Sequence, residues 1–189
     1  MTFSLPVVAL VLTALVIADF FIPMVPSATT IAAIAGFIVG NWVLIAALVL
    51  WAAASSWLGD VVGFRTLRLA RANWHWRVRG SAKVAALEER LRSTLTRHPN
   101  LTTLVARFVP AGRTALAWAA TGAPEYHHTR MAALAAIAWS SYIVGLGLLI
   151  GWIFGAGVFS VAMTITSIAA GGFVLGWWIR TKPVPAPEQ

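Results

Sequence analysis

The sequence predicts an all-α polytopic membrane protein, and three features support this fold class. First, 59% of the 189 residues are hydrophobic and only 11% are charged, well below the roughly 25% charged residues of soluble domains. Second, uncharged runs cover residues 1–18, 20–59 and 131–179, and a bilayer-spanning helix needs roughly 20 apolar residues. Third, the basic residues gather between these runs. An ordinary soluble domain is therefore excluded.

The net charge of +8 is concentrated in one polar segment. Nine of the 14 Lys and Arg residues lie between Arg65 and Arg97. The positive-inside rule makes this segment cytoplasmic, with its cations facing anionic lipid head groups. Without a recognition motif, nucleic-acid binding is not expected. The chain has no cysteine, so disulfides and thiolate metal sites are excluded.

The first half of the chain reads as a broken helix followed by a full span. A helix over residues 5–22 should stop at Pro23-Met-Val-Pro26, because proline removes backbone donors. Hydroxyls at residues 27–30 could then cap a short helix of about 14 residues, too short to cross the bilayer at 1.5 Å per residue. Residues 42–64 form a full span. The first run lacks the features of a cleaved signal peptide, so we expect it to be retained.

The second half repeats this order after an interfacial segment over residues 65–98. Residues 81–98 have apolar side chains at helical spacing and should form an amphipathic helix on the membrane surface, ended by Pro99. Residues 101–122 carry Pro110 and Gly112 in their middle and are flanked by basic residues, which predicts a re-entrant hairpin. Residues 131–179 form two spans divided near residue 155, and residues 183–189 a disordered tail.

Weak internal similarity supports two matching halves. Phe-Ile-Pro and Phe-Val-Pro recur 87 positions apart, and Ser-Ser-Trp and Ser-Ser-Tyr recur 85 positions apart. Interrupted hydrophobic segments at matching positions are typical of inverted-repeat transporters and point to a substrate site at the breaks. We therefore predict one membrane domain over residues 1–182, with a first repeat over 5–64 and a second over 101–179. Chance similarity in an apolar sequence is the rival interpretation.

Four charged residues in apolar surroundings are candidates for function. Arg107 and Arg113 bracket the Pro-Gly break, and intramembrane arginines that offer a planar fork of donors suit a phosphate or carboxylate. Asp19 and Asp60 could carry protons or act as their counter-ions. The alternative interpretation is that the two arginines extend to the membrane interface and that the two aspartates are exposed at helix ends.

Other chemistry has little support in the sequence. His127 and His128 are adjacent and would diverge by about 100° on a helix, with no carboxylate cluster near them. No phosphate-binding loop or nucleophile–base arrangement is present. We expect no metal, no cofactor and no enzymatic activity.

Three segments together resemble the DedA family of membrane proteins, also described as the SNARE-associated or VTT domain group. They are Asp19-Phe-Phe-Ile-Pro-Met-Val-Pro-Ser27, Gly59-Asp60-Val-Val-Gly63-Phe64 and Arg107-Phe-Val-Pro-Ala-Gly-Arg113-Thr114. The last is similar to the family pattern Arg-Phe-x-Pro-x-x-Arg-Thr and is the most specific. Two departures stand out: Ala28 where many members have Glu, and Phe64 in place of Tyr.

The resemblance implies two facing re-entrant hairpins and ion-driven transport or lipid translocation; bacterial members recycle undecaprenyl phosphate. It places the basic roles on Arg107 and Arg113 and the acidic roles on Asp19 and Asp60. The full set of expected site residues is: for substrate binding Arg107, Pro110, Arg113 and Thr114; for proton coupling Asp19 and Asp60; and for the structure of the motifs Pro23, Pro26, Ser27, Gly59, Gly63 and Gly112. Ala28 puts proton coupling in doubt, or shifts it to Asp19.

These features predict a flippase of the bacterial cytoplasmic membrane for an anionic lipid, with polyprenyl phosphate as the preferred substrate. The expected partners are membrane lipids and the lipid phosphate, with protons or sodium as candidate coupling ions and a homo-oligomer left open. Two other classes remain open: a proton-driven exporter of small solutes or drugs, and a non-transporting protein that shapes membranes or binds partners through residues 74–98.

Overall fold

The computed structural model describes residues 5–22, 26–73, 82–109, 111–123 and 126–155, together with scattered positions between 157 and 174. Throughout these residues the regular structure is helical, as predicted. The principal helices are α1 (Leu5–Phe21), α2 (Ser27–Phe37), α3 (Trp42–Asn73), α4 (Ala82–Arg97), α5 (Pro99–Ala106), α6 (Gly112–Ala120) and α7 (His128–Phe154).

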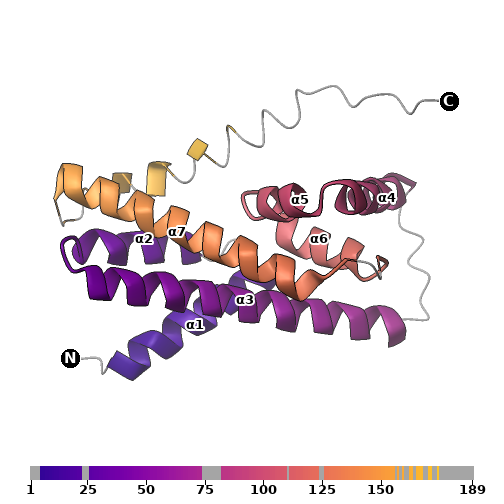
Figure 1. Cartoon of the computed structure of the whole chain (residues 1–189), viewed down its shortest axis with the longest axis horizontal. Helices are drawn as coiled ribbons and strands as arrows, with labels where there is room; N and C mark the ends of the chain where they lie inside the picture. The colour runs from indigo at the N-terminus through magenta and orange to yellow at the C-terminus, as the bar shows by residue number, and fades with distance from the viewer. Residues whose placement is uncertain are drawn as a thin grey trace.

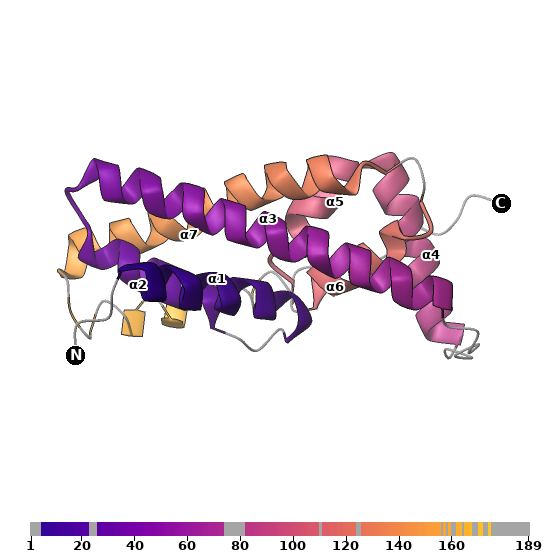
Figure 2. The ribbon, with the colours of Figure 1, turned by 90° about the horizontal axis from the view of Figure 1, so that it is seen from below.

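Two long helices, α3 and α7, form the axis of the molecule (Figures 1 and 2). They contain 32 and 27 residues and pack against each other. At 1.5 Å per residue they are about 48 and 40 Å long. Both are long and apolar enough to cross a membrane. Helices α1 and α2 pack against this pair toward one end, and α4, α5 and α6 gather at the other.

The helix boundaries correct several sequence predictions. Helix α3 continues through Arg65 to Asn73, so the start of the predicted interfacial segment belongs to this helix. Helix α4 ends at Arg97, and Pro99 is the first residue of α5, because proline fits the first helical position, where no backbone donor is needed. The amphipathic α4 agrees with the prediction for residues 81–98.

The predicted cap of α2 is wrong. Helix α2 has 11 residues and no side-chain cap. The hydroxyls of Thr29 and Thr30 instead donate to the carbonyl of Pro26 at 3.0 and 2.8 Å. Ser27 is 1% exposed and lies inside the helix. These two hydroxyls thus bond the carbonyl that precedes the helix. The backbone N–H groups of the first turn of α2 have no side-chain partner.

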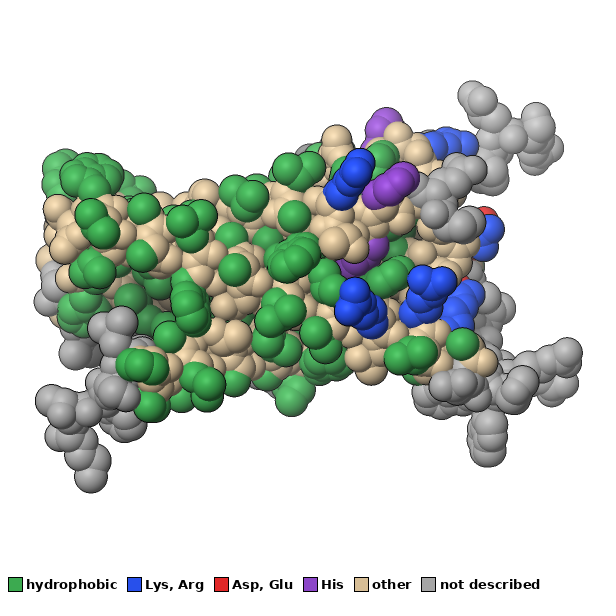
Figure 3. All heavy atoms as spheres, turned by 60° about the horizontal axis from the view of Figure 1, so that its bottom comes forward, with side chains coloured by type: hydrophobic (Ala, Val, Ile, Leu, Met, Phe, Trp, Pro, Cys, Tyr) green, Lys and Arg blue, Asp and Glu red, His purple; other side chains and the backbone are tan. Residues whose placement is uncertain are grey.

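The surface is divided by chemistry along the long axis. Large apolar side chains are exposed on α3 and α7, including Trp42, Leu50 and Trp152, which are 79%, 69% and 76% exposed. Cationic and histidine side chains gather instead at the end that carries α4, α5 and α6 (Figure 3). Exposed large apolar side chains in such number are typical of a surface that contacts protein or lipid.

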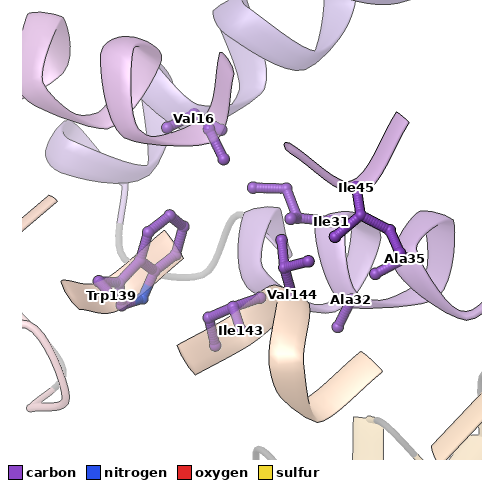
Figure 4. Close-up of a cluster of buried hydrophobic side chains, with 9 residues drawn as sticks. Val16, Ile31, Ala32, Ala35, Ile45, Trp139, Ile143 and Val144 are labelled. Atoms are coloured by element: carbon purple, nitrogen blue, oxygen red, sulfur yellow. The ribbon is translucent and has the colours of Figure 1, made fainter. Parts of the chain in front are cut away.

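The main core lies where α1, α2, α3 and α7 meet (Figure 4). Val16, Ile31, Trp139 and Val144 are each at most 6% exposed. Ala32 and Ala35 on α2 are completely buried, so the helix backbones approach closely there. This core fills the bundle on the side away from the basic end.

Glycines set the closest approach in this bundle. A side chain at Gly147 of α7 would overlap the backbone of Ala32, and one at Gly151 would meet the backbone of Gly36 at 2.7 Å. Small residues at matching positions let two helix backbones pack directly, as is common for membrane helices. Helix α2 is therefore held against α7 by backbone contact.

This contact makes Gly147 sensitive to the smallest substitution. Gly147→Ala should lower stability by about 1–3 kcal/mol, because an added methyl group overpacks a site bounded by backbone. Thermal unfolding in detergent micelles, followed by circular dichroism, measures the change. Gly145→Ala is the matched control, since nothing lies within 4 Å of its added carbon. Equal unfolding midpoints for the two variants would contradict the close approach of α2 and α7.

Candidate functional site

The two arginines flank a break between α5 and α6. Arg107 follows α5 directly as its C-cap residue, and Arg113 is the second residue of α6. Between them, Ala111 adopts a left-handed conformation with φ of 59°, which is uncommon for a residue other than glycine. The predicted interruption of residues 101–122 is present. Pro110 itself lies outside the described residues.

The carboxylate of Asp60, on α3, joins both arginines. Arg107 donates to one oxygen through Nη2, and Arg113 donates to the other through Nε at 3.0 Å and Nη2 at 2.8 Å. Arg113 also donates through Nη1 to Asp19 of α1 at 3.0 Å. Four charges that are far apart in the sequence thus form one connected set, here called the ion cluster: Asp19, Asp60, Arg107 and Arg113.

The ion cluster is buried. The side chains of Arg107, Asp60 and Arg113 are 3%, 9% and 11% exposed, and that of Asp19 is 20% exposed. The arginines therefore do not extend to a surface, and Asp60 is not an exposed helix end. Two cations balance two anions, so the cluster is close to neutral. Removing one member of such a set leaves an uncompensated buried charge, which costs far more than the pair contributes.

Polar groups of α3 and α7 accept further hydrogen bonds from the two arginines. Ser56 lies one turn before Asp60; its hydroxyl accepts from Arg107 at 2.6 Å and its carbonyl from Arg113 at 3.3 Å. The carbonyl of Ala132 accepts from Arg107 at 3.2 Å. Ser56 is fully buried. Sequence reasoning did not select it, although its four-residue spacing from Asp60 places both on one helix face.

Helix α1 is held close to α3 so that Asp19 reaches the cluster. A side chain at Gly63 would overlap the ring of Phe20, and one at Gly59 would meet the backbone of Ile17 at 3.3 Å. The hydroxyl of Thr114 donates to the carbonyl of Phe20 at 2.6 Å. These two glycines of the predicted motif therefore allow the helix contact, and Thr114 ties α6 to α1.

The other predicted motif residues have simpler positions. Gly112 begins α6, where an added side chain would overlap the carbonyl of Ala106. Pro26 precedes α2, with Ser27 as its first residue. Pro23 lies outside the described residues.

A small void touches the ion cluster, and His128 borders it. The void measures about 10 Å³ and is lined by Asp60, Arg107 and Arg113 among others. His128, the first residue of α7, is 6% exposed. Its ring stacks on Phe64 with centroids 4.2 Å apart. From the sequence His128 was not expected to form a site, because no metal ligands accompany it; its burial at the start of α7 is evident only in the structure.

No family model, curated protein or solved structure matches this chain. The resemblance to the DedA family therefore remains one of motifs. Among the described residues, no group of three or more His, Cys, Asp or Glu side chains could hold a metal ion.

The cluster makes Asp60 the most sensitive member for stability. Asp60→Asn should destabilise the protein by about 3–5 kcal/mol, because Arg107 would be buried without its carboxylate. Chemical unfolding in micelles measures this effect.

A double variant provides the control for this prediction. Asp60→Asn combined with Arg107→Gln should be more stable than Asp60→Asn alone, since it removes the unpaired charge. Glu89→Gln removes a carboxylate that is 73% exposed and 4.0 Å from its partner, and should change stability little. A single Asp60→Asn effect as small as that of Glu89→Gln would contradict the role of Asp60.

Proposed function

We propose that this protein is a polytopic flippase that moves an anionic lipid across the bacterial cytoplasmic membrane, with polyprenyl phosphate as its preferred substrate. The observation that carries the proposal is the buried, charge-balanced ion cluster at a broken helix. Intramembrane charge is costly and marks a functional site by default. Irregular backbone at membrane depth is tolerated where it is buried in protein or lines a cavity.

Membrane insertion is supported by the distribution of exposed side chains. The stretch of α3 from Trp42 to Gly59 contains no charged residue and exposes large apolar side chains along its length. Charges then appear at Asp60 and Arg65. At 1.5 Å per residue, Asp60 lies about 27 Å from Trp42 and about 8 Å from Arg65. The ion cluster is thus close to the basic, cytoplasmic side in the proposed orientation.

The charge balance defines what an anion must do to bind. Each guanidinium already has a carboxylate partner, so a phosphate has to displace a carboxylate or bind when one is protonated. Arginine recognises phosphate through paired donors in a planar fork. Protonation of Asp60 or Asp19 would release such a fork, which links substrate binding to the proton gradient in this proposal. In this proposal Asp60 and Asp19 supply the protonatable carboxylates, so the glutamate that many family members have at the position of Ala28 is not required.

Translocation also requires access from both sides. The void at the ion cluster is lined by His128 at the start of α7, and the apolar core of α1, α2, α3 and α7 fills the bundle toward the other end. In the proposed transport cycle, this arrangement is a state in which the ion cluster is closed off from the membrane side that carries Trp42. The two helix breaks, before α2 and before α6, are the places where α2 and α6 would move.

Flux through proteoliposomes tests the proposal. Arg113→Gln should reduce translocation of a fluorescent polyprenyl phosphate at least about tenfold, because one lost charge-assisted pair corresponds to that factor. Arg65→Gln, which removes an exposed cation of α3, is the control and should keep its flux. Flux in Arg113→Gln equal to that of the control would refute an anion site at the cluster.

The competing class gives a different pattern in the same assay. A proton-driven exporter of small solutes would depend on Asp19 and Asp60 and carry no polyprenyl phosphate. Imposing a pH gradient across the vesicles distinguishes ion-driven movement from movement down the gradient of the lipid itself.

The orientation can be tested by cysteine labelling, because the chain has no native cysteine. Single cysteines at Asn41 and Ser93, both exposed, should react with a membrane-impermeant maleimide from opposite sides. Ser93 should be cytoplasmic. Labelling of both from the same side would contradict the proposed topology.

A further inference from the structure

A larger pocket opens beside the ion cluster, on the basic end of the molecule. It measures about 550 Å³ and lies between the end of α3 and the start of α7. The side chains that matter for its chemistry are Phe64, Arg68, Tyr126, His127, His128 and Arg130. Apart from Phe64, which ends the second motif, none of these residues belongs to the sequence motifs. Figure 3 shows that cationic and histidine side chains gather at this end of the surface.

Two cations line this pocket from different helices. Arg68 comes from α3 and Arg130 from α7. Among the described residues, neither is in an ion pair, whereas the neighbouring Arg71 pairs with Glu88 at 2.9 Å. Two guanidiniums that line one pocket, without carboxylate partners in this part of the structure, offer donors to a group with two negative charges. A phosphate monoester has that charge and accepts the paired donors of arginine.

His128 supplies a second, independent sign of a ligand. Its Nδ1 atom is buried and has no hydrogen-bond partner within the described ranges, and such atoms in native structures call for an explanation. The side chain lines both this pocket and the small void at the ion cluster. His128 therefore stands between the open pocket and the buried arginines.

Tyr126 contributes its ring and has its hydroxyl engaged elsewhere. Thr103 donates to the carbonyl of Pro99 at 2.6 Å, so its oxygen accepts from the Tyr126 hydroxyl at 2.5 Å. Burial raises the pKa of the Tyr126 phenol, against the opposing effect of the hydrogen bond with Thr103. The phenol therefore stays neutral near pH 7 and adds no negative charge to the pocket wall.

We infer that this pocket binds the phosphate group of a phosphate monoester through Arg68 and Arg130, with His128 as a further hydrogen-bonding group and as the partition from the ion cluster. Its role as the cytoplasmic entry site for the substrate rests on the proposed function. Binding itself does not, because it can be measured without flux.

Calorimetry on the full chain in neutral maltoside micelles tests the inference, with dodecyl phosphate and inorganic phosphate as probes. Arg68→Gln and Arg130→Gln should each weaken binding about tenfold, the effect of one lost charge-assisted contact. Arg65→Gln removes the same charge nearby without touching the pocket and should keep the affinity of the parent protein. Dodecyl phosphate that binds more tightly than inorganic phosphate assigns the site to a lipid head group, and equal affinities assign it to free phosphate.

Two further variants separate the pocket from the ion cluster. His128→Phe keeps a ring against Phe64 and removes both nitrogens, and should weaken binding several-fold. Arg113→Gln should keep binding to the pocket even if flux is lost. The inference is overturned if Arg65→Gln weakens binding as much as Arg68→Gln, or if Arg113→Gln abolishes binding while Arg68→Gln and Arg130→Gln do not. Unchanged binding in His128→Phe overturns the part assigned to His128.

Discussion

The bond between the Asp60 carboxylate and two guanidiniums is the constraint on which the rest of the structure depends. Arg107 and Arg113 stand on either side of a helix break and would repel each other in an apolar bundle. Asp60 contacts both, so the break can be buried. Helix α3 must therefore present Asp60 at one depth, and α5 and α6 must end and begin at fixed positions around it. The attraction between opposite charges thus fixes the register of three helices.

The packing of the other helices follows from this requirement. Asp19 reaches Arg113 because Gly59 and Gly63 allow α1 to lie close to α3. Val16 of this core lies about one turn before Asp19 on α1, so buried apolar side chains adjoin the cluster on that side. A dry, low-dielectric surrounding strengthens each ion pair and raises the cost of any unpaired charge. Apolar packing and charge pairing support each other here.

Much of the fold follows from local sequence rules. Hydrophobic runs and proline breaks predicted the helices and the interruption at residues 101–122, because each depends on nearby residues alone. The predicted end of α3 at residue 64 was wrong. Arg65, Arg68 and Arg71 are as compatible with a continuing helix as with a segment at the membrane interface. The sequence singled out Asp19, Asp60, Arg107 and Arg113 because charge in apolar surroundings is rare. It could not identify Ser56 or His128, since serine and histidine are common in helices and their importance arises only from partners distant in the chain.

The left-handed residue Ala111 connects the two helices whose ends carry the arginines of the ion cluster. A non-glycine residue in this conformation costs about 1–3 kcal/mol and holds α5 and α6 at a fixed angle. A change in its φ would rotate α6 relative to α5, and the adjoining ends of these helices carry Arg113 and Arg107. Both arginines share one carboxylate, so that rotation cannot occur while Asp60 retains both bonds. The ion pairs of Asp60 therefore restrain the connection between α5 and α6 in its left-handed conformation.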